Sequence, residues 1–315
     1  MTWRELLRPS ERDRPATAIV FMLIGLAFLS FQDSWIKLAS SETSFWQLQT
    51  LRSIFNMALL FVGTALVGRI GVLRPRRLRY VLLRSVFLAV TMIFFFSGAP
   101  FLSPAEMGAG LYTFPVFVTL LSGLVLGEKV GPLRLGAVAV AALGAILIVR
   151  PFEADFRAVQ ALPVGAGFFY ACNVLTVRRY CRQESTFAMA FVVAIVFLLT
   201  SVIGIAALSL FPPEQQARIA WPFLFERWPV LGWSIIGMAF VASITNLLGN
   251  LSLVQAYQSA EPSWLAPIDY TYLAMAVVWG LILFGTVPDS LTIMGMILIA
   301  GAGLFTAWRE RLRRA

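Results

Sequence analysis

Four charged side chains lie inside long apolar stretches of this sequence, where a charge is costly. Asp33 and Lys37 are four residues apart in the first apolar stretch, Arg52 is in the second, and Asp269 is in the ninth. An ionisable group at the middle of a membrane span costs ~2.5–3.5 kcal/mol on insertion scales unless it is paired or faces water. These four residues are therefore the first candidates for a polar binding site or for coupling to an ion.

Arg52 has the side chain best suited to a carboxylate or a phosphate, because its planar guanidinium donates two parallel hydrogen bonds. Asp33 and Lys37 share a helix face at a spacing of four residues, and Asp33 could hold Arg52 in place while the site is empty. The alternative is a structural ion cluster near the membrane interface, with Lys37 extending toward water. The sequence leaves both roles open.

Asp269 has no obvious cation near it within its own apolar stretch. A carboxyl group removed from water holds a proton more readily, so Asp269 could take up and release a coupling proton; the alternative is a structural role. Pro267, two residues earlier, cannot donate a backbone hydrogen bond and frees a carbonyl group one turn before it. Freed backbone of this kind is tolerated inside a membrane where it lines a cavity or is buried by protein.

Aromatic and amide side chains accompany these charges. Tyr270 and Tyr272 lie in the ninth stretch, and Tyr112 occupies the corresponding part of the fourth. Their rings could stack on a planar ligand or bind a cation, or they could only pack between helices. Asn246 and Asn250, four residues apart in the eighth stretch, could bind substrate or join helices by hydrogen bonds.

The elements that carry these residues follow from composition. Of the 315 residues, 59% are apolar and 13% are charged, against ~25% charged residues in soluble domains, and this excludes a water-soluble monomer. One span needs ~20 largely apolar residues. The stretches that qualify are Ala16–Leu38, Phe45–Val67, Tyr80–Ser97, Pro104–Leu126, Leu133–Val149, Ala161–Val177, Thr186–Leu210, Val230–Leu253, Pro262–Phe284 and Leu291–Ala307. The sequence therefore predicts an all-α polytopic membrane protein of ten transmembrane helices.

Residue types that are missing or rare exclude several kinds of chemistry. The absence of histidine excludes His-rich zinc sites and Ser–His–Asp hydrolases. The two cysteines, Cys172 and Cys181, have no metal or redox spacing, and no phosphate-binding Gly-x-x-x-x-Gly-Lys pattern occurs. We therefore expect no metal, no cofactor and no enzymatic activity.

The net charge of +9 is explained by membrane topology. With the N-terminus in the cytoplasm, 19 of the 25 Lys and Arg residues fall on the cytoplasmic side of ten alternating spans, as the positive-inside rule requires. The basic residues form no continuous patch, so nucleic acid is not an expected partner. We expect a bacterial inner-membrane protein, monomeric or homodimeric, with both termini cytoplasmic: a segment at residues 1–15 and a basic tail at 309–315.

The chain also shows signs of an internal repeat. Residues 104–127 can be laid over residues 262–285 without gaps at an offset of 158, and Glu42-Thr43-Ser44-Phe45 resembles Glu184-Ser185-Thr186-Phe187. When each half has five spans, the second half crosses the membrane in the opposite direction to the first. These matches therefore indicate two inverted five-helix repeats. The expected repeats are residues 16–150 and 158–308.

Several short motifs follow one another in a recognisable order. They are Asp33 to Lys37, Leu51-Arg52-Ser53, Leu102-Ser103-Pro104-Ala105-Glu106, Phe114-Pro115-Val116-Phe117, Leu126-Gly127-Glu128-Lys129-Val130-Gly131, Ala266-Pro267-Ile268-Asp269-Tyr270-Thr271 and Leu283-Phe284-Gly285-Thr286-Val287-Pro288. In these motifs the chain resembles the EamA family of the drug/metabolite transporter superfamily, and within it the branch of S-adenosylmethionine and riboflavin uptake carriers. Thr286 departs from the pattern, because the family often has an acidic residue there. The resemblance implies that spans one to four and six to nine surround a central cavity, with spans five and ten outside.

The expected function is secondary active transport of a small organic metabolite by alternating access, with a proton as the candidate coupling ion. One alternative is an intramembrane enzyme acting on lipid or isoprenoid substrates, which would need catalytic groups at one depth, whereas Asp33 and Asp269 are expected toward opposite faces. Another is a non-transporting membrane sensor whose polar centre is sealed. Neither motif nor topology distinguishes import from export.

Overall fold

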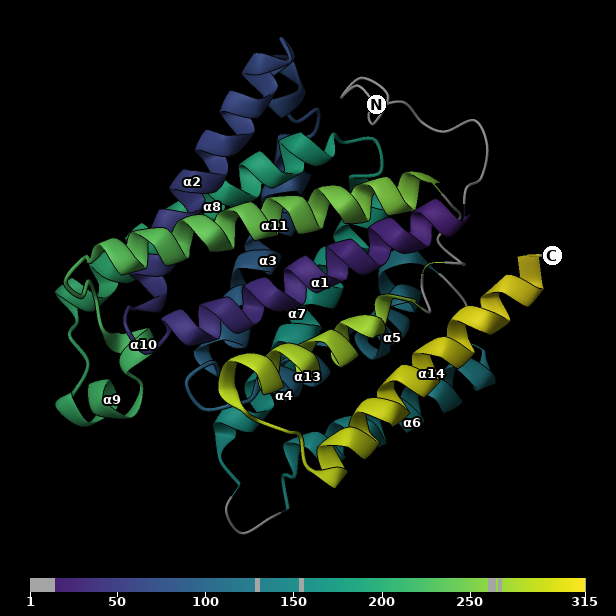
Figure 1. The fold of residues 1–315 in the computed structure, drawn as a ribbon. Coiled ribbons are helices and arrows are strands. Elements are labelled where there is room, and N and C mark those ends of the chain that lie inside the picture. Colours follow the sequence, from purple (N-terminus) through teal and green to yellow (C-terminus); the bar gives the residue numbers. More distant parts are fainter. Residues whose placement is uncertain (1–14, 128–130, 153–155, 260–264, 266–267, 315) are drawn as a thin grey trace.

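The computed structural model describes residues 15–127, 131–152, 156–259, 265 and 268–314, and every regular element in these residues is helical. The α-helices are α1 (Pro15–Ala39), α2 (Phe45–Leu66), α3 (Leu78–Ser97), α4 (Pro104–Leu111), α5 (Phe114–Leu126), α6 (Pro132–Val149), α7 (Leu162–Tyr180), α8 (Thr186–Leu210), α9 (Gln215–Ala220), α10 (Pro222–Phe225), α11 (Trp233–Ser259), α13 (Thr271–Phe284) and α14 (Ser290–Arg314). Two short 3₁₀ helices are η1 (Ile70–Leu73) and η2 (Ala158–Ala161). The all-α class is confirmed for this part of the chain (Figure 1).

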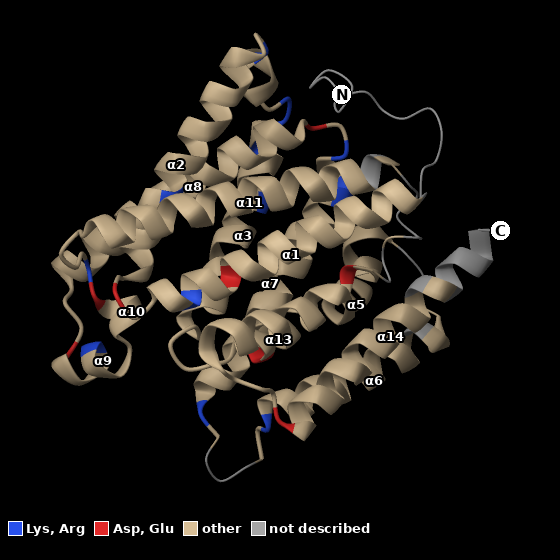
Figure 2. Ribbon diagram, in the orientation of Figure 1, with Lys and Arg blue, Asp and Glu red and all other residues tan. Residues whose placement is uncertain are grey.

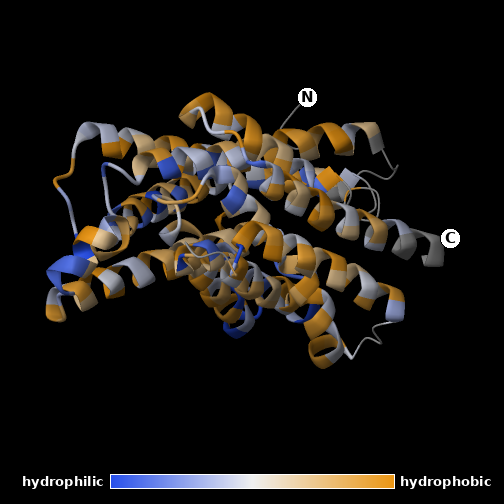
Figure 3. Ribbon diagram, turned by 90° about the horizontal axis from the view of Figure 1, so that it is seen from below, coloured by the Kyte–Doolittle hydropathy of each residue, from blue (hydrophilic) through white to orange (hydrophobic). Residues whose placement is uncertain are grey.

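Six helical segments in the described ranges are long and apolar enough to cross a membrane: those of α1, α3, α4–α5, α7, α8 and α11. Large apolar side chains on these helices face outward, and Leu124 and Ile203 are 83% and 66% exposed. Hydrophobic residues recur along most of the helices (Figure 3). Such exposure is unfavourable in water and favourable in lipid, so the chain is a multi-pass membrane protein.

α2 is less apolar in its first half because it turns polar side chains inward. Gln47, Gln49, Thr50, Arg52 and Ser53 are all buried there. A span with a polar face is stable in a bilayer only when that face meets other helices or water. α2 packs against α8 and α11, so its polar residues face the interior of the bundle.

The fourth apolar stretch, expected as one helix, is interrupted at Tyr112 and Thr113 between α4 and α5. The hydroxyl of Thr113 donates to the carbonyl oxygen of Gly110 at 2.7 Å. Pro115 lies in the first turn of α5, where its missing N–H leaves no helical hydrogen bond unmade. The expected span Pro104–Leu126 is long and apolar enough to cross a membrane, but it consists of two helices, and Pro115 in the first turn of α5 favours the new helix start.

A matching turn precedes α13, 158 residues further along the chain. The hydroxyl of Thr271 donates to the carbonyl oxygen of Ile268, again at 2.7 Å. α5 and α13 also end alike, at Gly127 with φ 72° and Gly285 with φ 63°, a left-handed conformation that glycine adopts without strain. The expected ninth span begins at Pro262, and its residues before Ile268, except Leu265, lie outside the described residues; Pro267 is one of them.

Helices that are distant in sequence pair along their lengths (Figure 1). α1 lies along α11, α3 along α7, α2 along α8, and α6 along α14. Glycines allow the last pair to approach closely, because a Cβ atom on Gly144 would lie 2.7 Å from the main-chain oxygen of Gly295. α4 contacts both α1 and α13, so the turn at Tyr112 lies where these helices meet.

The bundle has two ends, which the connections of α2 define. At the lysine end α1 finishes with Lys37 in its last turn and α2 begins; at the arginine end α2 finishes and α3 begins after Arg76 and Arg77. α1 begins and α14 finishes on the same side of the bundle (Figure 1). Charged residues are concentrated in loops and at helix ends (Figure 2).

Arg150 and Asp289 connect α6 to α14 at the lysine end. Arg150 closes α6 in a left-handed conformation, φ 48°, and its guanidinium forms an ion pair with the Asp289 carboxylate. Asp289 also caps α14 by accepting a hydrogen bond from the main-chain N–H of Thr292 at 3.0 Å. The hydrogen bonds from Thr292 and the positive charge of Arg150 hold the pKa of Asp289 below its usual value.

Candidate functional site

Two tyrosine rings stack where α4 and α13 meet α1. The centroids of Tyr112 and Tyr272 are 5.0 Å apart and their planes differ by 19°. The hydroxyl of Tyr272 donates to the carboxylate of Asp33 at 2.6 Å, and the hydroxyl of Tyr112 donates to the main-chain oxygen of Asp269 at 3.0 Å. The side chain of Gln32 also donates to Asp33, at 3.0 Å. Four of the residues expected at the site therefore lie in one place.

Asp269 is half-buried beside aromatic hydroxyls. Its charge interacts with Tyr170 and Tyr270, and no Lys or Arg of the described residues forms an ion pair with it. The Tyr270 ring lies 5.7 Å from that of Tyr112, and Tyr170 packs edge-on against Phe114 at 5.0 Å. Asp33, Tyr112, Asp269, Tyr270 and Tyr272 are called the central cluster below. The tyrosine hydroxyls of this cluster can donate and accept hydrogen bonds, and its ionised carboxylates can accept them.

Arg52 is 5% exposed and lies beyond hydrogen-bonding distance of Asp33, which acts on it through space. Its Nη1 donates to the side-chain oxygen of Gln49 at 3.2 Å, and its Cζ lies 6.0 Å from the centroid of Phe96. Its Nε has no hydrogen-bond partner among the described residues. A buried N–H without a partner is unfavourable, so a carboxylate or carbonyl group of a ligand would stabilise Arg52.

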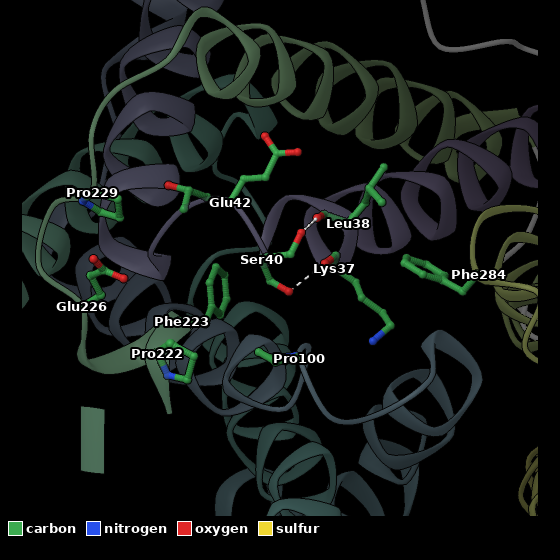
Figure 4. Close-up of a pocket in the computed structure, with 12 residues that line it drawn as sticks. Lys37, Leu38, Ser40, Glu42, Pro100, Pro222, Phe223, Glu226, Pro229 and Phe284 are labelled. Atoms are coloured by element: carbon green, nitrogen blue, oxygen red, sulfur yellow. Dashed lines mark hydrogen bonds between the residues drawn. The ribbon is translucent and has the colours of Figure 1, made fainter. Parts of the chain in front are cut away.

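Lys37, one turn beyond Asp33 on α1, lines a cavity of about 480 Å³ at the lysine end (Figure 4). Its Nζ donates to the main-chain oxygen of Ala99 at 2.6 Å and lies 5.1 Å from the centroid of Phe284. The wall also includes Ser40, Glu42, Phe223 and Glu226. This cavity, the lysine vestibule, comes within one turn of helix α1 of the central cluster.

Arg84 and Asn173 are interior polar residues that the sequence does not single out. The Nε of Arg84 on α3 donates to the side-chain oxygen of Asn173 on α7 at 2.9 Å. Asn173 is buried, and the charge of Arg84 also acts on Tyr170. The available signal is that Arg84 lies four residues inside the apolar stretch that begins at Tyr80. Its partner on α7 is visible only in the folded chain.

Asn246 and Asn250 do not join the central cluster. Asn250 is exposed, and its side chain donates to the main-chain oxygen of Asn246, within α11, at 2.8 Å. Their neighbour Ser243 is buried and donates to the main-chain oxygen of Arg52 on α2 at 3.3 Å. The polar face of α11 thus supports the position of Arg52 through the serine.

Within the described ranges, no group of three or more His, Cys, Asp or Glu residues could hold a metal ion. The ionisable groups described above that face the interior are two carboxylates, the tyrosine hydroxyls, the Lys37 ammonium and the guanidinium groups of Arg52 and Arg84.

Apolar helices around buried charges and a cavity define the class as a multi-pass helical membrane protein. The chain belongs to the EamA-like transporter family, which matches residues 16–150. It is 31% identical to the riboflavin transporter of Vibrio cholerae over 245 residues, which are 77% of this chain and 76% of the relative. The family expected from the motifs is confirmed.

Two further comparisons extend over most of the chain. The pseudopaline exporter CntI of Pseudomonas aeruginosa is 24% identical over 289 residues, 91% of this chain and 94% of the relative. A crystal structure of a protein superposes with a TM-score of 0.58 at 19% identity, covering 91% of this chain and 97% of that one. The first comparison supports a transporter of small metabolites, and the second shows a likeness of fold.

Proposed function

We propose that the protein is a secondary active transporter of a small organic metabolite, in which the central cluster binds the substrate and Asp269 carries a coupling proton. The observation that carries this proposal is the stacked pair of Tyr112 and Tyr272. Through their hydroxyl groups, these rings connect Asp33 on α1 to the turn before α13. Asp33 lies one turn of α1 before Lys37, which lines the lysine vestibule. Binding and movement of the helices would therefore be coupled at one place.

Two inverted five-helix repeats, residues 16–150 and 158–308, account for the helix pairing. If each span is exchanged for the one five places away, α1 with α11 becomes α7 with α3, and α2 with α11 becomes α8 with α3. The pairs α2 with α8 and α6 with α14 are unchanged by the exchange, because each pair consists of two spans that are five places apart. The matching turns at Thr113 and Thr271 support the same correspondence. Alternating access would follow from the two repeats exchanging conformations.

The site fits a substrate that has a planar ring and an anionic or carbonyl group. Tyrosine faces favour stacking with flat rings, and the Nε of Arg52 offers an unused donor. The name of the Vibrio cholerae relative makes riboflavin, which has a flat ring system, the first candidate. The name of the Pseudomonas aeruginosa relative adds pseudopaline.

Proton coupling rests on the surroundings of Asp269. Its carboxyl group lies among tyrosine hydroxyls and, among the described residues, forms no ion pair, so gaining a proton would not break a salt bridge. An inner-membrane location with both termini in the cytoplasm agrees with the positive-inside bias and with the common side of the start of α1 and the end of α14.

The test is flux of riboflavin and a metabolite panel into and out of proteoliposomes, with and without an imposed pH gradient. The wild type should accumulate its substrate only with the gradient. Asp269→Asn should bind the substrate but lose gradient-driven accumulation, whereas the control Glu214→Gln, at an exposed acidic residue before α9, should behave as the wild type. Wild-type rates for both Asp269→Asn and Arg52→Ala would contradict the site, and accumulation independent of the gradient would contradict proton coupling.

A further inference from the structure

A second cavity, of about 210 Å³, opens at the arginine end of the bundle. Its wall combines the loop before α3 with the end of α7 and the loop that follows α7. The residues that define it are Arg76, Arg77, Arg179, Tyr180, Arg182 and Glu184. It is called the arginine vestibule below.

The acidic side chain in this wall is already occupied. The two carboxylate oxygens of Glu184 accept hydrogen bonds from the main-chain N–H groups of Arg76 at 2.8 Å and Arg77 at 2.7 Å. The carboxylate is therefore held by the backbone and does not pair with the guanidinium groups. Four guanidinium groups around one small cavity leave a surplus of positive charge, which is complementary to an anion.

The arginines of the α7 side are held in position. Arg179 donates to the main-chain oxygen of Val125, and its Cζ lies 5.2 Å from the centroid of Tyr180. The ring of Tyr180 stacks on that of Tyr80 at 4.2 Å, with planes only 1° apart. The Nε of Arg182 donates to the main-chain oxygen of Arg178 at 2.7 Å. These contacts join α3 to α7 and restrict the guanidinium groups, which lowers the entropy cost of binding a ligand.

The depth of the cavity and an apolar stripe beside it indicate the source of the anion. α3 and α7 are both long enough to cross a membrane, so the start of α3 and the end of α7 lie at the level of lipid headgroups. Leu78, Leu82 and Val86 follow one another at successive turns of α3 and are 52%, 39% and 49% exposed. The stripe leads from the arginines into the hydrocarbon region, as an acyl chain would.

We propose that the arginine vestibule binds the phosphate group of an anionic phospholipid, with an acyl chain of that lipid along Leu78, Leu82 and Val86. Guanidinium groups match phosphate oxygens with paired hydrogen bonds. The site is separate from the central cluster, from which it differs in both ligand and depth, and it would fasten the loop before α3 and the end of α7 to the membrane surface.

The test is native mass spectrometry of the purified full-length protein in detergent with added phosphatidylglycerol or phosphatidylcholine. The wild type should bind one phosphatidylglycerol more tightly than phosphatidylcholine, and Arg76→Gln/Arg182→Gln should weaken this binding roughly tenfold. The matched control is Arg218→Gln/Arg227→Gln, which removes the same charge from exposed positions at the lysine end. Wild-type binding by the vestibule variant, or an equal loss in the control, would overturn the proposal.

A second arm separates the lipid from free phosphate. The melting temperature is measured in inorganic phosphate against chloride at constant ionic strength, for the wild type and the vestibule variant. We expect no phosphate-specific shift in either protein, because the apolar stripe contributes to lipid binding. A shift in the wild type alone, without preference for phosphatidylglycerol, would overturn the lipid and identify a soluble phosphate compound as the ligand.

Discussion

The lysine and arginine vestibules include residues that would correspond in the two proposed repeats. The match between Glu42 and Glu184 sets an offset of 142, and this offset also pairs Lys37 with Arg179. Among the described residues, the carboxylate of Glu42 accepts one hydrogen bond, from the side chain of Ser234 at 3.4 Å, whereas that of Glu184 accepts two from main-chain N–H groups at 2.7 and 2.8 Å. One end thus has the larger cavity, and the other has a loop held by a carboxylate.

The two ends therefore differ in how their acidic side chains are held and in the charged groups that line each cavity. The lysine vestibule contains Lys37, one turn of α1 from Asp33, whereas the arginine vestibule contains Arg76, Arg77, Arg179 and Arg182. The four comparisons below each set a substitution at or toward one end against a substitution at or toward the other.

The largest effect is expected along α6, where the two ends are packed differently. Gly144, toward the lysine end, has the main-chain oxygen of Gly295 only 2.7 Å from the position of a Cβ atom, whereas Gly136, toward the arginine end, has nothing within 4 Å. Gly144→Ala should lower the free energy of unfolding by about 1–3 kcal/mol through overpacking, and Gly136→Ala should not lower it. Unfolding in detergent micelles measures both. Equal effects would mean that the α6–α14 contact is looser than the structure shows.

Lys37 and Arg179 differ in their distance from the central cluster. Lys37→Gln removes the ammonium one turn from Asp33 and should raise the KM for the substrate found by the flux panel roughly tenfold, about 1.4 kcal/mol. Arg179→Gln should change the KM less than twofold, because Arg179 is exposed at the far end of α7. A larger effect from Arg179 than from Lys37 would reverse the roles of the two vestibules.

Glu184 and Glu42 differ in how firmly they hold their loops. Glu184→Gln weakens two charge-assisted hydrogen bonds, so the loop at the arginine end should open about fivefold more often, corresponding to about 1 kcal/mol. The labelling rate of the buried native Cys181, in a chain with Cys172 replaced by serine, measures this opening. In a chain with both native cysteines replaced by serine, Glu42→Gln should change the labelling of Ser40→Cys, a buried position before Glu42, less than twofold. Equal rates with and without Glu184→Gln would contradict the role of the carboxylate.

The smallest effect is expected from Asp289 at the lysine end. Asp289→Asn keeps a capping side chain but loses the ion pair with Arg150, so the free energy of unfolding should fall by about 0.2–1 kcal/mol at neutral pH. The pKa of Asp289 is lowered in the folded protein, so its contribution is present above the unfolded pKa of ~3.9 and is lost as the pH falls through the folded value. The two proteins should therefore converge in acid.

The matched contact at the arginine end, Arg179 to the main-chain oxygen of Val125, has no titratable acceptor. The stability difference between Arg179→Gln and the wild type should therefore stay constant over the same acid range. Thermal unfolding from pH 7 to pH 3 compares the two contacts, and a difference for Asp289→Asn that grows in acid would contradict the assigned sign.

Regular spans were predictable from the sequence because their apolar character is local. The expected span Thr186–Leu210 coincides with α8, and the first two expected spans agree with α1 and α2 within one residue at each end. The break before α5 was not expected as a helix boundary, although Pro115 marks the place. α11 begins at Trp233 and continues to Ser259, beyond the expected Leu253, because its last turns are too polar to be recognised by hydropathy.

The site was predictable only as a set of separate residues. Asp33, Tyr112, Asp269 and Tyr272 stand out because charge and hydroxyl groups are costly in a membrane, but their contacts depend on how α4 and α13 cross α1. Arg84 and Asn173 could not be paired from sequence, because 89 residues separate them and only the packing of α3 on α7 brings them together. Asn250 has a similar polarity but turns away from the cluster.

In the proposed site, the hydrogen bond from Tyr272 to Asp33 would compete with the substrate for the carboxylate. A ligand that pairs with the Asp33 carboxylate must displace a phenol that belongs to another helix, so only ligands that bind better than this internal group are retained. Displacement would also remove a hydrogen bond that joins the start of α13 to α1, while the packing of the two helices remains. Selectivity and a weaker α1–α13 contact would then be two results of one exchange of hydrogen-bond partners.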